Sequence, residues 1–285
     1  TLVAYAYGRS ARIITAAAVL LALISPAVTA AEPYFPLSGT DAQSLGRGGT
    51  SIATPPGKSS ALGNPATLTP AGFFAVGAEY LRDRQSEEGS WLISVVDTSS
   101  SMRGALNYYS NPEFAGFGKN LWGVALSQML ASNLTLGGSY HTGEYKLVSG
   151  ETENLRAIDL GILLGLGSRV SLGYVTRNVY ASDDDLLDRT DGFGAAVHLP
   201  WTVLLAVDVE ETTHSGGGED LRAGIEFSPF AWLTGRFGYQ DLAGDMTYYT
   251  MGITYTDANG TVDAAVLYDE EAERTDRIII GFTIK

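Results

Sequence analysis

Polar and apolar side chains alternate in short runs from residue 71 to residue 285. In the run 201–210, one face carries Trp201, Val203, Leu205, Val207 and Val209. The other face carries Thr202, Ala206, Asp208 and Glu210, with Leu204 as an apolar exception. The same alternation returns at 221–228 and at 278–284. Successive side chains of a strand point to opposite faces, so a period of two predicts a series of β-strands.

Two architectures bury or cover the apolar face of such strands. In a sandwich, a second sheet covers it. In an outer-membrane barrel the arrangement is inverted, because apolar side chains meet lipid and polar ones line the interior.

The lengths of the connections distinguish these two architectures. Long connections are expected at residues 82–89, 110–119, 145–154, 180–189, 212–219, 241–245 and 269–275. Short ones are expected at 97–101, 130–133, 165–168, 199–201, 228–230 and 257–260. Long and short connections alternate without a break and join fourteen strands. An even strand number with tight turns at one end and longer loops at the other is typical of a barrel. The sequence therefore predicts an all-β fold, a 14-stranded antiparallel transmembrane outer-membrane β-barrel over residues 71–285.

The first thirty residues have the pattern of a secretory signal peptide. Arg9 and Arg12 precede an apolar run at 13–24, and Val28 and Ala30 occupy the small-residue positions before a cleavage site. The alternative is a membrane-spanning helix, but the run is shorter than the ~20 residues that a span needs. We expect a signal peptide at 1–30 and export of the mature chain.

Residues 31–70 differ from the rest in being rich in Gly, Pro and small side chains. The run Ser44-Leu45-Gly46-Arg47-Gly48-Gly49 is followed by Ala61-Leu62-Gly63-Asn64-Pro65-Ala66-Thr67-Leu68, just before the first expected strand. This pair of motifs resembles the N-terminal segment of the FadL-like long-chain fatty-acid transport family, and is similar to that of the related PorV-type barrels.

The resemblance implies a fourteen-stranded barrel whose N-terminal segment, here 31–70, folds into the barrel as a plug. It assigns the plug motif to Asn64, Pro65 and Ala66. We expect Gly46, Gly48 and Gly49 to let the backbone turn tightly in a narrow interior, where larger side chains would clash.

Charged side chains occur on the polar face of several strands. The candidates for the interior are Asp159, Arg177, His198, Asp208, Glu210, Arg222, Glu226 and Arg236. Arg222, Glu226 and Arg236 are expected to form a network of mixed sign. These groups either neutralise one another, as buried charges do, or they line a solute path or contact the plug.

A catalytic or metal site finds little support. Ser139 and His141 lie two apart on one strand face, about 6.5 Å apart at the backbone, and no acid is evident to orient the histidine. His141, His198 and His214 are scattered, without zinc-ligand spacing. We expect no enzyme, no cofactor and no metal.

The net charge of −14 is concentrated at the long connections. Such an acidic rim disfavours nucleic acid, which binds basic patches. It either consists of solvated loop tips or holds divalent cations at a lipopolysaccharide surface. We therefore expect outer-membrane lipids and lipopolysaccharide as surroundings.

Two functions remain open at this point. The resemblance implies passive transport of a small hydrophobic solute across the outer membrane of a Gram-negative-type cell. The alternative is a non-transporting scaffold or secretion accessory that docks a protein partner.

Overall fold

The computed structural model describes residues 41–54, 62–68, 74–83, 89–110, 118–146, 152–182, 187–212, 218–243 and 246–285. The expected signal peptide and the first ten residues of the expected plug lie outside the described residues. Within the described ranges the elements are α2 (Ala42–Gly46), the 3-10 helix η1 (Pro65–Thr67), β1 (Phe74–Asp83), β2 (Ser90–Asp97), β3 (Met102–Ser110), β4 (Gly118–Ala131), β5 (Leu134–Lys146), β6 (Thr152–Leu166), β7 (Val170–Ala181), β8 (Thr190–Leu199), β9 (Val203–Thr212), β10 (Glu219–Phe230), β11 (Leu233–Leu242), β12 (Met246–Thr256), β13 (Gly260–Asp269) and β14 (Arg274–Ile284). No helix among them is long and apolar enough to cross a bilayer.

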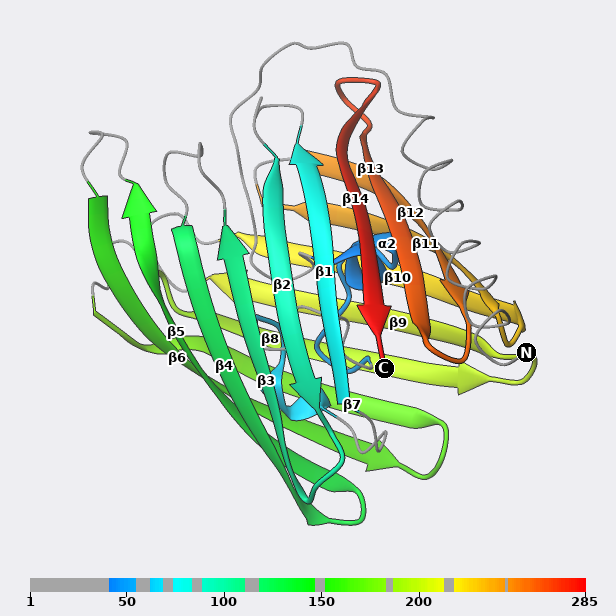
Figure 1. Cartoon of the computed structure of the whole chain (residues 1–285), viewed down its shortest axis with the longest axis horizontal. Helices are drawn as coiled ribbons and strands as arrows, with labels where there is room; N and C mark the ends of the chain where they lie inside the picture. The colour runs from blue at the N-terminus through cyan, green and yellow to red at the C-terminus, as the bar shows by residue number, and fades with distance from the viewer. Residues whose placement is uncertain are drawn as a thin grey trace, which may run out of the picture.

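The strands form a closed antiparallel barrel (Figure 1). Each strand pairs with its neighbours in the chain, and β1 pairs with β14 over eight residue pairs, from Val76↔Ile284 to Asp83↔Arg277. Closure leaves no strand edge with unpaired backbone groups, as a barrel in lipid requires. The predicted fold class and strand number are confirmed.

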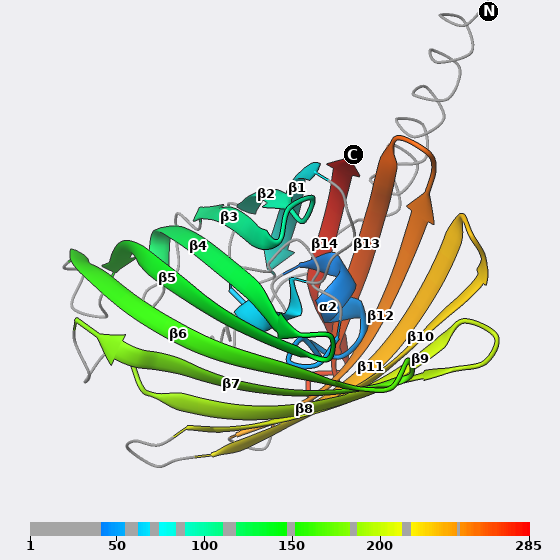
Figure 2. The ribbon, with the colours of Figure 1, turned by 90° about the horizontal axis from the view of Figure 1, so that it is seen from below.

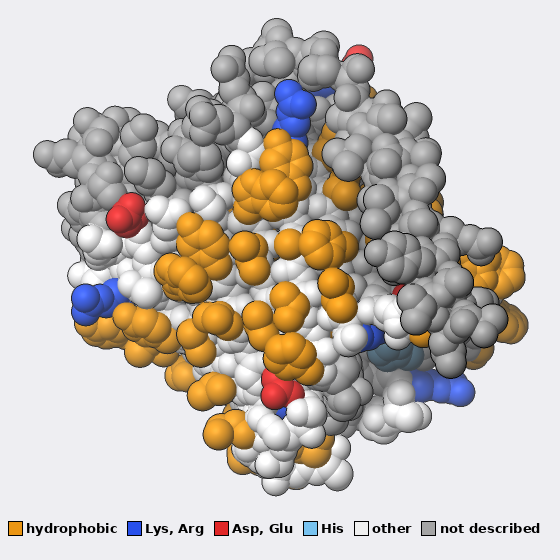
Figure 3. Space-filling view, in the orientation of Figure 1, with side chains coloured by type: hydrophobic (Ala, Val, Ile, Leu, Met, Phe, Trp, Pro, Cys, Tyr) orange, Lys and Arg blue, Asp and Glu red, His pale blue; other side chains and the backbone are white. Residues whose placement is uncertain are grey.

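The outer surface of the barrel is apolar. In β2, Trp91 and Ile93 are exposed, whereas Leu92 and Ser94 are buried. Figure 3 shows hydrophobic side chains spread over the face that includes β1 and β2, with charged ones toward its margins. This pattern fits strands that present one face to hydrocarbon.

Aromatic side chains gather at the end of the barrel with the short turns. Phe230 and Trp232 stack with ring centroids 5.2 Å apart, and Tyr255 lies 6.2 Å from Trp232. Trp201, in the turn between β8 and β9, is 86% exposed. Aromatic rings with a polar edge are suited to a membrane interface.

One turn lies elsewhere than expected. Residues 228–230 are not a turn, because β10 continues to Phe230 and residues 231–232 make the connection. The pairing steps from Phe227↔Gly235 to Phe230↔Leu233, so Ser228 and Pro229 oppose Thr234 in a bulge. A bulge tolerates proline within a strand, since the missing N–H is not needed there.

The described plug residues, 41–54 and 62–68, lie inside the ring of strands (Figure 2). Helix α2 contacts the inner face of β11–β14, and η1 contacts that of β4–β6. Leu45, Ile52, Ala66 and Leu68 have at most 1% of their surface exposed. The interior is therefore filled on opposite sides by two pieces of the same N-terminal segment.

Candidate functional site

Helix α2 begins at a capping residue and ends in glycine. The Asp41 carboxylate accepts hydrogen bonds from the backbone nitrogens of Gln43 and Ser44, both at 3.0 Å. Capping of this kind satisfies N–H groups that have no partner within the helix. Gly48 and Gly49 follow with φ of 71° and 78°, a conformation that glycine adopts without strain. The expectation of a tight turn is confirmed for Gly48 and Gly49, whereas Gly46 is the last residue of α2 and lies close to Gly252 of the wall.

The inner wall carries glycines where the plug backbone lies against it. A Cβ at position 238 would lie 1.9 Å from the Gly48 nitrogen, and one at position 161 would lie 2.0 Å from Asn64 Oδ1. Contacts of this kind recur around the wall, at Gly137, Gly161, Gly173, Gly194, Gly224, Gly238 and Gly252. The plug therefore packs closely against the backbone of β5–β8 and β10–β12 at these glycines.

Asp208 holds the middle of the plug. Its Oδ2 accepts hydrogen bonds from the backbone nitrogens of Ser51 at 2.6 Å and Ile52 at 2.9 Å, and its side chain is buried. Two N–H donors thus converge on one carboxylate oxygen, the stronger kind of hydrogen bond.

The plug motif joins the two plug pieces. Asn64 Oδ1 accepts from Ala66 N at 3.0 Å and caps η1, where Pro65 takes the first position. Asn64 Nδ2 donates to the Ile52 carbonyl at 2.7 Å. The carbonyl of Leu68 then accepts from Arg103 on β3 and Ser127 on β4, each at 3.1 Å. The motif therefore ties residues 62–68 both to residue 52 and to the wall.

A network of mixed sign binds the plug at the short-turn half of the barrel. Glu226 Oε2 lies 2.9 Å from Arg47 Nη1 of the plug and 2.7 Å from Arg236 Nε of β11. Arg236 also donates to Thr254, which donates to Asp263 at 2.6 Å. Because Arg47 is a plug residue, these pairs connect the plug to β10–β13.

A second network lies on the wall nearer the long loops. Glu210 pairs with both Arg177 and Arg222, and Arg222 Nη2 lies 2.7 Å from Asp220 Oδ2. The expected network of Arg222, Glu226 and Arg236 is therefore divided in two. Arg222 contacts β9 because its register partner there is Asp208, two residues from Glu210. Glu226 instead pairs with Arg236, its register partner on β11.

The expectation that no acid lies near Ser139 and His141 is wrong. Asp159 is the register partner of Ser139 on β6. His141 Nε2 lies 2.7 Å from Asp159 Oδ2 and 3.0 Å from Ser139 Oγ, which lies 3.2 Å from the same carboxylate oxygen. The separation of 6.5 Å holds for the backbone, and the side chains close it by leaning along the strand.

This cluster differs from a hydrolytic triad. In a triad, the acid holds one imidazole nitrogen and the serine faces the other. Here Ser139 and Asp159 both contact Nε2, and Nδ1 is buried with no hydrogen-bond partner among the described residues.

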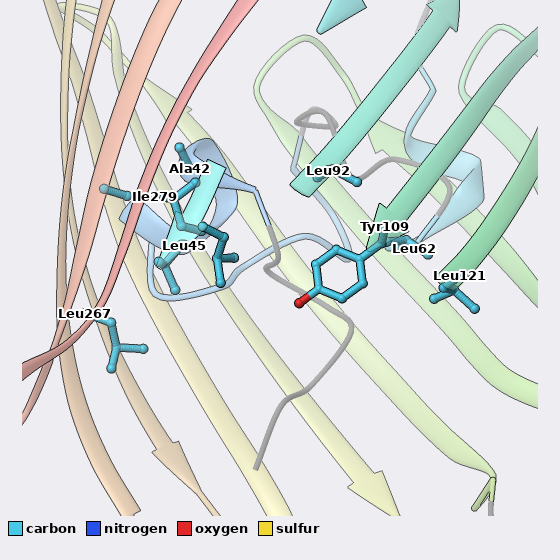
Figure 4. Close-up of a cluster of buried hydrophobic side chains, with 10 residues drawn as sticks. Ala42, Leu45, Leu62, Leu92, Tyr109, Leu121, Leu267 and Ile279 are labelled. Atoms are coloured by element: carbon cyan, nitrogen blue, oxygen red, sulfur yellow. The ribbon is translucent and has the colours of Figure 1, made fainter. Parts of the chain in front are cut away.

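An apolar cluster, which the alternating pattern alone does not reveal, lines the remaining arc of the wall. Figure 4 shows its side chains pointing from the wall and from the plug into the interior. It consists of Ala42, Leu45 and Leu62 of the plug with Leu81, Leu92, Tyr109, Leu121, Ala265, Leu267 and Ile279 of β1–β4, β13 and β14. The signal that could have revealed this cluster is a leucine or isoleucine at an inward-facing position of a strand, that is, two residues from another inward-facing residue.

The six charged candidates Asp159, Arg177, Asp208, Arg222, Glu226 and Arg236 all lie on the inner face, five of them buried and Glu226 partly exposed. His198 is also on this face but is exposed near the end with the short turns. Among the described residues no group of His, Cys, Asp and Glu has the arrangement of a metal site.

No family model and no curated protein sequence matches the chain. Solved structures do match it. The Ralstonia pickettii toluene transporter TbuX is 12% identical with a TM-score of 0.65, over 88% of this chain and 100% of that one. The CymD monoaromatic hydrocarbon channel is 12% identical with a TM-score of 0.63, over 88% and 97%. A Pseudomonas aeruginosa FadL homologue is 12% identical with a TM-score of 0.56, over 86% and 98%. The fold is therefore that of the FadL-like outer-membrane barrels.

Proposed function

We propose that this FadL-like barrel lies in the outer membrane and lets a small hydrophobic solute pass without an energy source. The observation that carries the proposal is this ten-residue apolar cluster inside a barrel whose inner surface also carries many buried polar and charged side chains. Apolar side chains in the interior do not contact lipid, so their presence there fits contact with an apolar solute. The names of the similar structures, a toluene transporter and a hydrocarbon channel, support the same substrate class.

The position of the apolar cluster supports entry from the end with the long loops. Leu81 lies two residues before the end of β1, Leu92 two residues after the start of β2, and Tyr109 one residue before the end of β3. All three strand ends face long connections. The ion pair of Glu226 with Arg47 of the plug lies toward the short turns. A solute that enters between the long loops would therefore meet Leu81, Leu92 and Tyr109 together with the plug residues that pack on them.

In this scheme the plug around Asn64, Pro65 and Ala66 gates the interior, and irregular strand pairing offers a sideways exit into the membrane. The longest interruption lies between β6 and β7, where the pairing steps from Ile158↔Tyr180 to Leu160↔Thr176. We infer no catalysis, since Ser139 and Asp159 share one nitrogen of His141. Lipids and lipopolysaccharide are the surroundings that the apolar outer face implies.

The test is uptake of radiolabelled toluene, and of a long-chain fatty acid, by Gram-negative cells that make the full chain. The variant Leu267→Gln places an amide in the apolar cluster, and Leu267→Met is its near-isosteric apolar control. We expect Leu267→Gln to slow uptake several-fold and Leu267→Met to leave it unchanged. Equal uptake by both variants and by cells without the protein would refute the proposal.

A scaffold that docks a protein partner is the second candidate, and the filled, charge-paired half of the interior favours it. Plug contacts to Asp208, Glu226 and Arg103 hold residues 41–54 and 62–68 in place without any solute. If no solute enters while the protein assembles normally in the membrane, the scaffold is the better account.

A further inference from the structure

The cluster of Ser139, His141 and Asp159 lies at the border between the two kinds of inner wall. His141 faces inward on β5, and its register partners are Gly123 on β4 and Ala157 on β6. Neither partner carries a polar side chain. Two residues from Gly123 on β4 is Leu121, a member of the apolar cluster. The imidazole is thus one of the polar groups that adjoin this edge of the apolar surface, with buried Asn107, the partner of Gly123 on β3, as another.

The hydrogen bonds of the cluster determine which nitrogen carries the proton. Nε2 lies 2.7 Å from the Asp159 carboxylate, an acceptor, so Nε2 bears the hydrogen. Ser139 Oγ donates to the same carboxylate at 3.2 Å. In the neutral imidazole Nδ1 is then an acceptor, and it has no donor among the described residues. A buried polar atom without a partner costs free energy unless a ligand or water supplies one.

Local charge limits what that ligand can be. The charged side chain in contact with His141 is Asp159, and its carboxylate is buried. A second carboxylate brought beside Asp159 would be repelled, whereas a neutral hydroxyl would not.

We propose that His141 Nδ1 accepts a hydrogen bond from the hydroxyl of a neutral, largely apolar solute, such as a phenol, whose ring lies against the apolar cluster. The inference rests on the proposed function, because it names the solute class for the same interior. It makes His141 a specificity residue that favours neutral hydroxylated compounds over pure hydrocarbons and over carboxylates. Ser139 and Asp159 act as positioning residues that hold the ring and its tautomer.

The test compares phenol, toluene and benzoate, which share one aromatic ring. Radiolabelled ligand is equilibrated by dialysis against the purified full chain in detergent micelles, with empty micelles as the blank. His141→Gln retains a donor near the position of Nε2, so it can still reach Asp159, but it removes Nδ1. His198→Gln, at an exposed histidine near the short turns, is the matched control.

We expect His141→Gln to lower the ratio of phenol to toluene affinity by roughly threefold to tenfold, the factor that one neutral hydrogen bond supplies. Toluene affinity itself and both affinities of His198→Gln should stay unchanged, and benzoate should bind more weakly than phenol. An unchanged ratio with toluene still bound, an equal loss of both ligands, or preferred binding of benzoate would overturn the inference while the proposed function stands. Absence of any toluene binding by the wild-type chain would overturn both.

Discussion

Side-chain size on the inner wall follows what lies opposite in the interior. Gly238 and Gly235 both belong to β11, three residues apart, so Gly238 faces the interior and Gly235 the outer side of the barrel. A Cβ at 238 would collide with the plug, whereas one at 235 would meet nothing within 4 Å. Glycine is thus required where the backbone of the plug approaches, and merely tolerated elsewhere on the same strand.

Gly238→Ala should unseat the plug near Gly48. Overpacking a filled interior costs about 1–3 kcal/mol, so the urea midpoint of unfolding in detergent should fall. Gly235→Ala is the control and should leave the midpoint unchanged. Equal midpoints for both variants would show that the plug does not sit on β11.

Asp208→Ala removes the common acceptor of Ser51 N and Ile52 N. A buried donor left without a partner costs roughly 1–3 kcal/mol, so we expect a loss of at least ~2 kcal/mol in the free energy of unfolding. Asp208→Asn keeps an oxygen acceptor and should lose less. Urea unfolding followed by tryptophan fluorescence measures both, and an equal loss in the two variants would contradict the assigned hydrogen bonds.

At the scale of elements, strand irregularities are supported by interior side chains. Between β6 and β7, Asp159 alone opposes Arg177, Asn178 and Val179. Asn178 has φ of 54°, and its backbone nitrogen donates to Asp159 Oδ1 at 2.9 Å. The same carboxylate thus completes the bulge and holds His141, so the wall and the candidate solute contact depend on one residue.

Asn178→Val should destabilise this bulge. A β-branched residue in the left-handed region costs about 1–2 kcal/mol, whereas Asn178→Gly should cost less because glycine adopts that conformation freely. The free energy of unfolding of the two variants tests the difference. A valine variant as stable as the glycine variant would mean that residue 178 does not hold a positive φ.

The whole molecule has polar contacts that bind the plug on one side of its interior and, on the other, an apolar cluster that the wall and the plug share. Asp208, Glu226 and the wall glycines hold the plug on one side, and Leu81, Leu121 and Ile279 line the other. A barrel filled in this manner is no open channel for water-soluble compounds.

Liposomes that contain the full chain should therefore not swell in isotonic sugars. The double variant Gly224→Ala/Gly238→Ala, which places methyl groups against Arg47 and Gly48, should increase swelling by loosening the plug. A chain without residues 31–70 should increase it further. Rapid swelling with the wild-type chain, or unaltered permeability in every variant, would contradict a plug that closes the barrel.

Local patterns in the sequence were sufficient to predict most of the strands of the barrel wall and their faces. The alternation at Leu221, Ala223 and Ile225 against Arg222 and Gly224 predicts both the strand and its faces, because pleating alone sets that period. The turn at 228–230 was misplaced because Pro229 marks a turn in most contexts, and only the pairing with β11 shows that a bulge accommodates it.

The alternating pattern does not predict which side chains pair across neighbouring strands. Asp159 is twenty residues from Ser139, and the register of β5 and β6 brings the two side chains together. Arg222 likewise turns to Glu210 because of the register with β9. Register depends on the exact length of each loop and on every bulge, so a pattern of faces does not specify it.

The sequence by itself determined the strand number, the inward and outward faces and the sorting of long and short connections, because each follows from neighbouring residues in the chain. Tertiary structure alone decided which charges pair, where the plug backbone requires glycine and which leucines gather into an apolar arc. These depend on distances across a closed ring between residues far apart in the chain, and those distances exist only once the ring has closed around its plug.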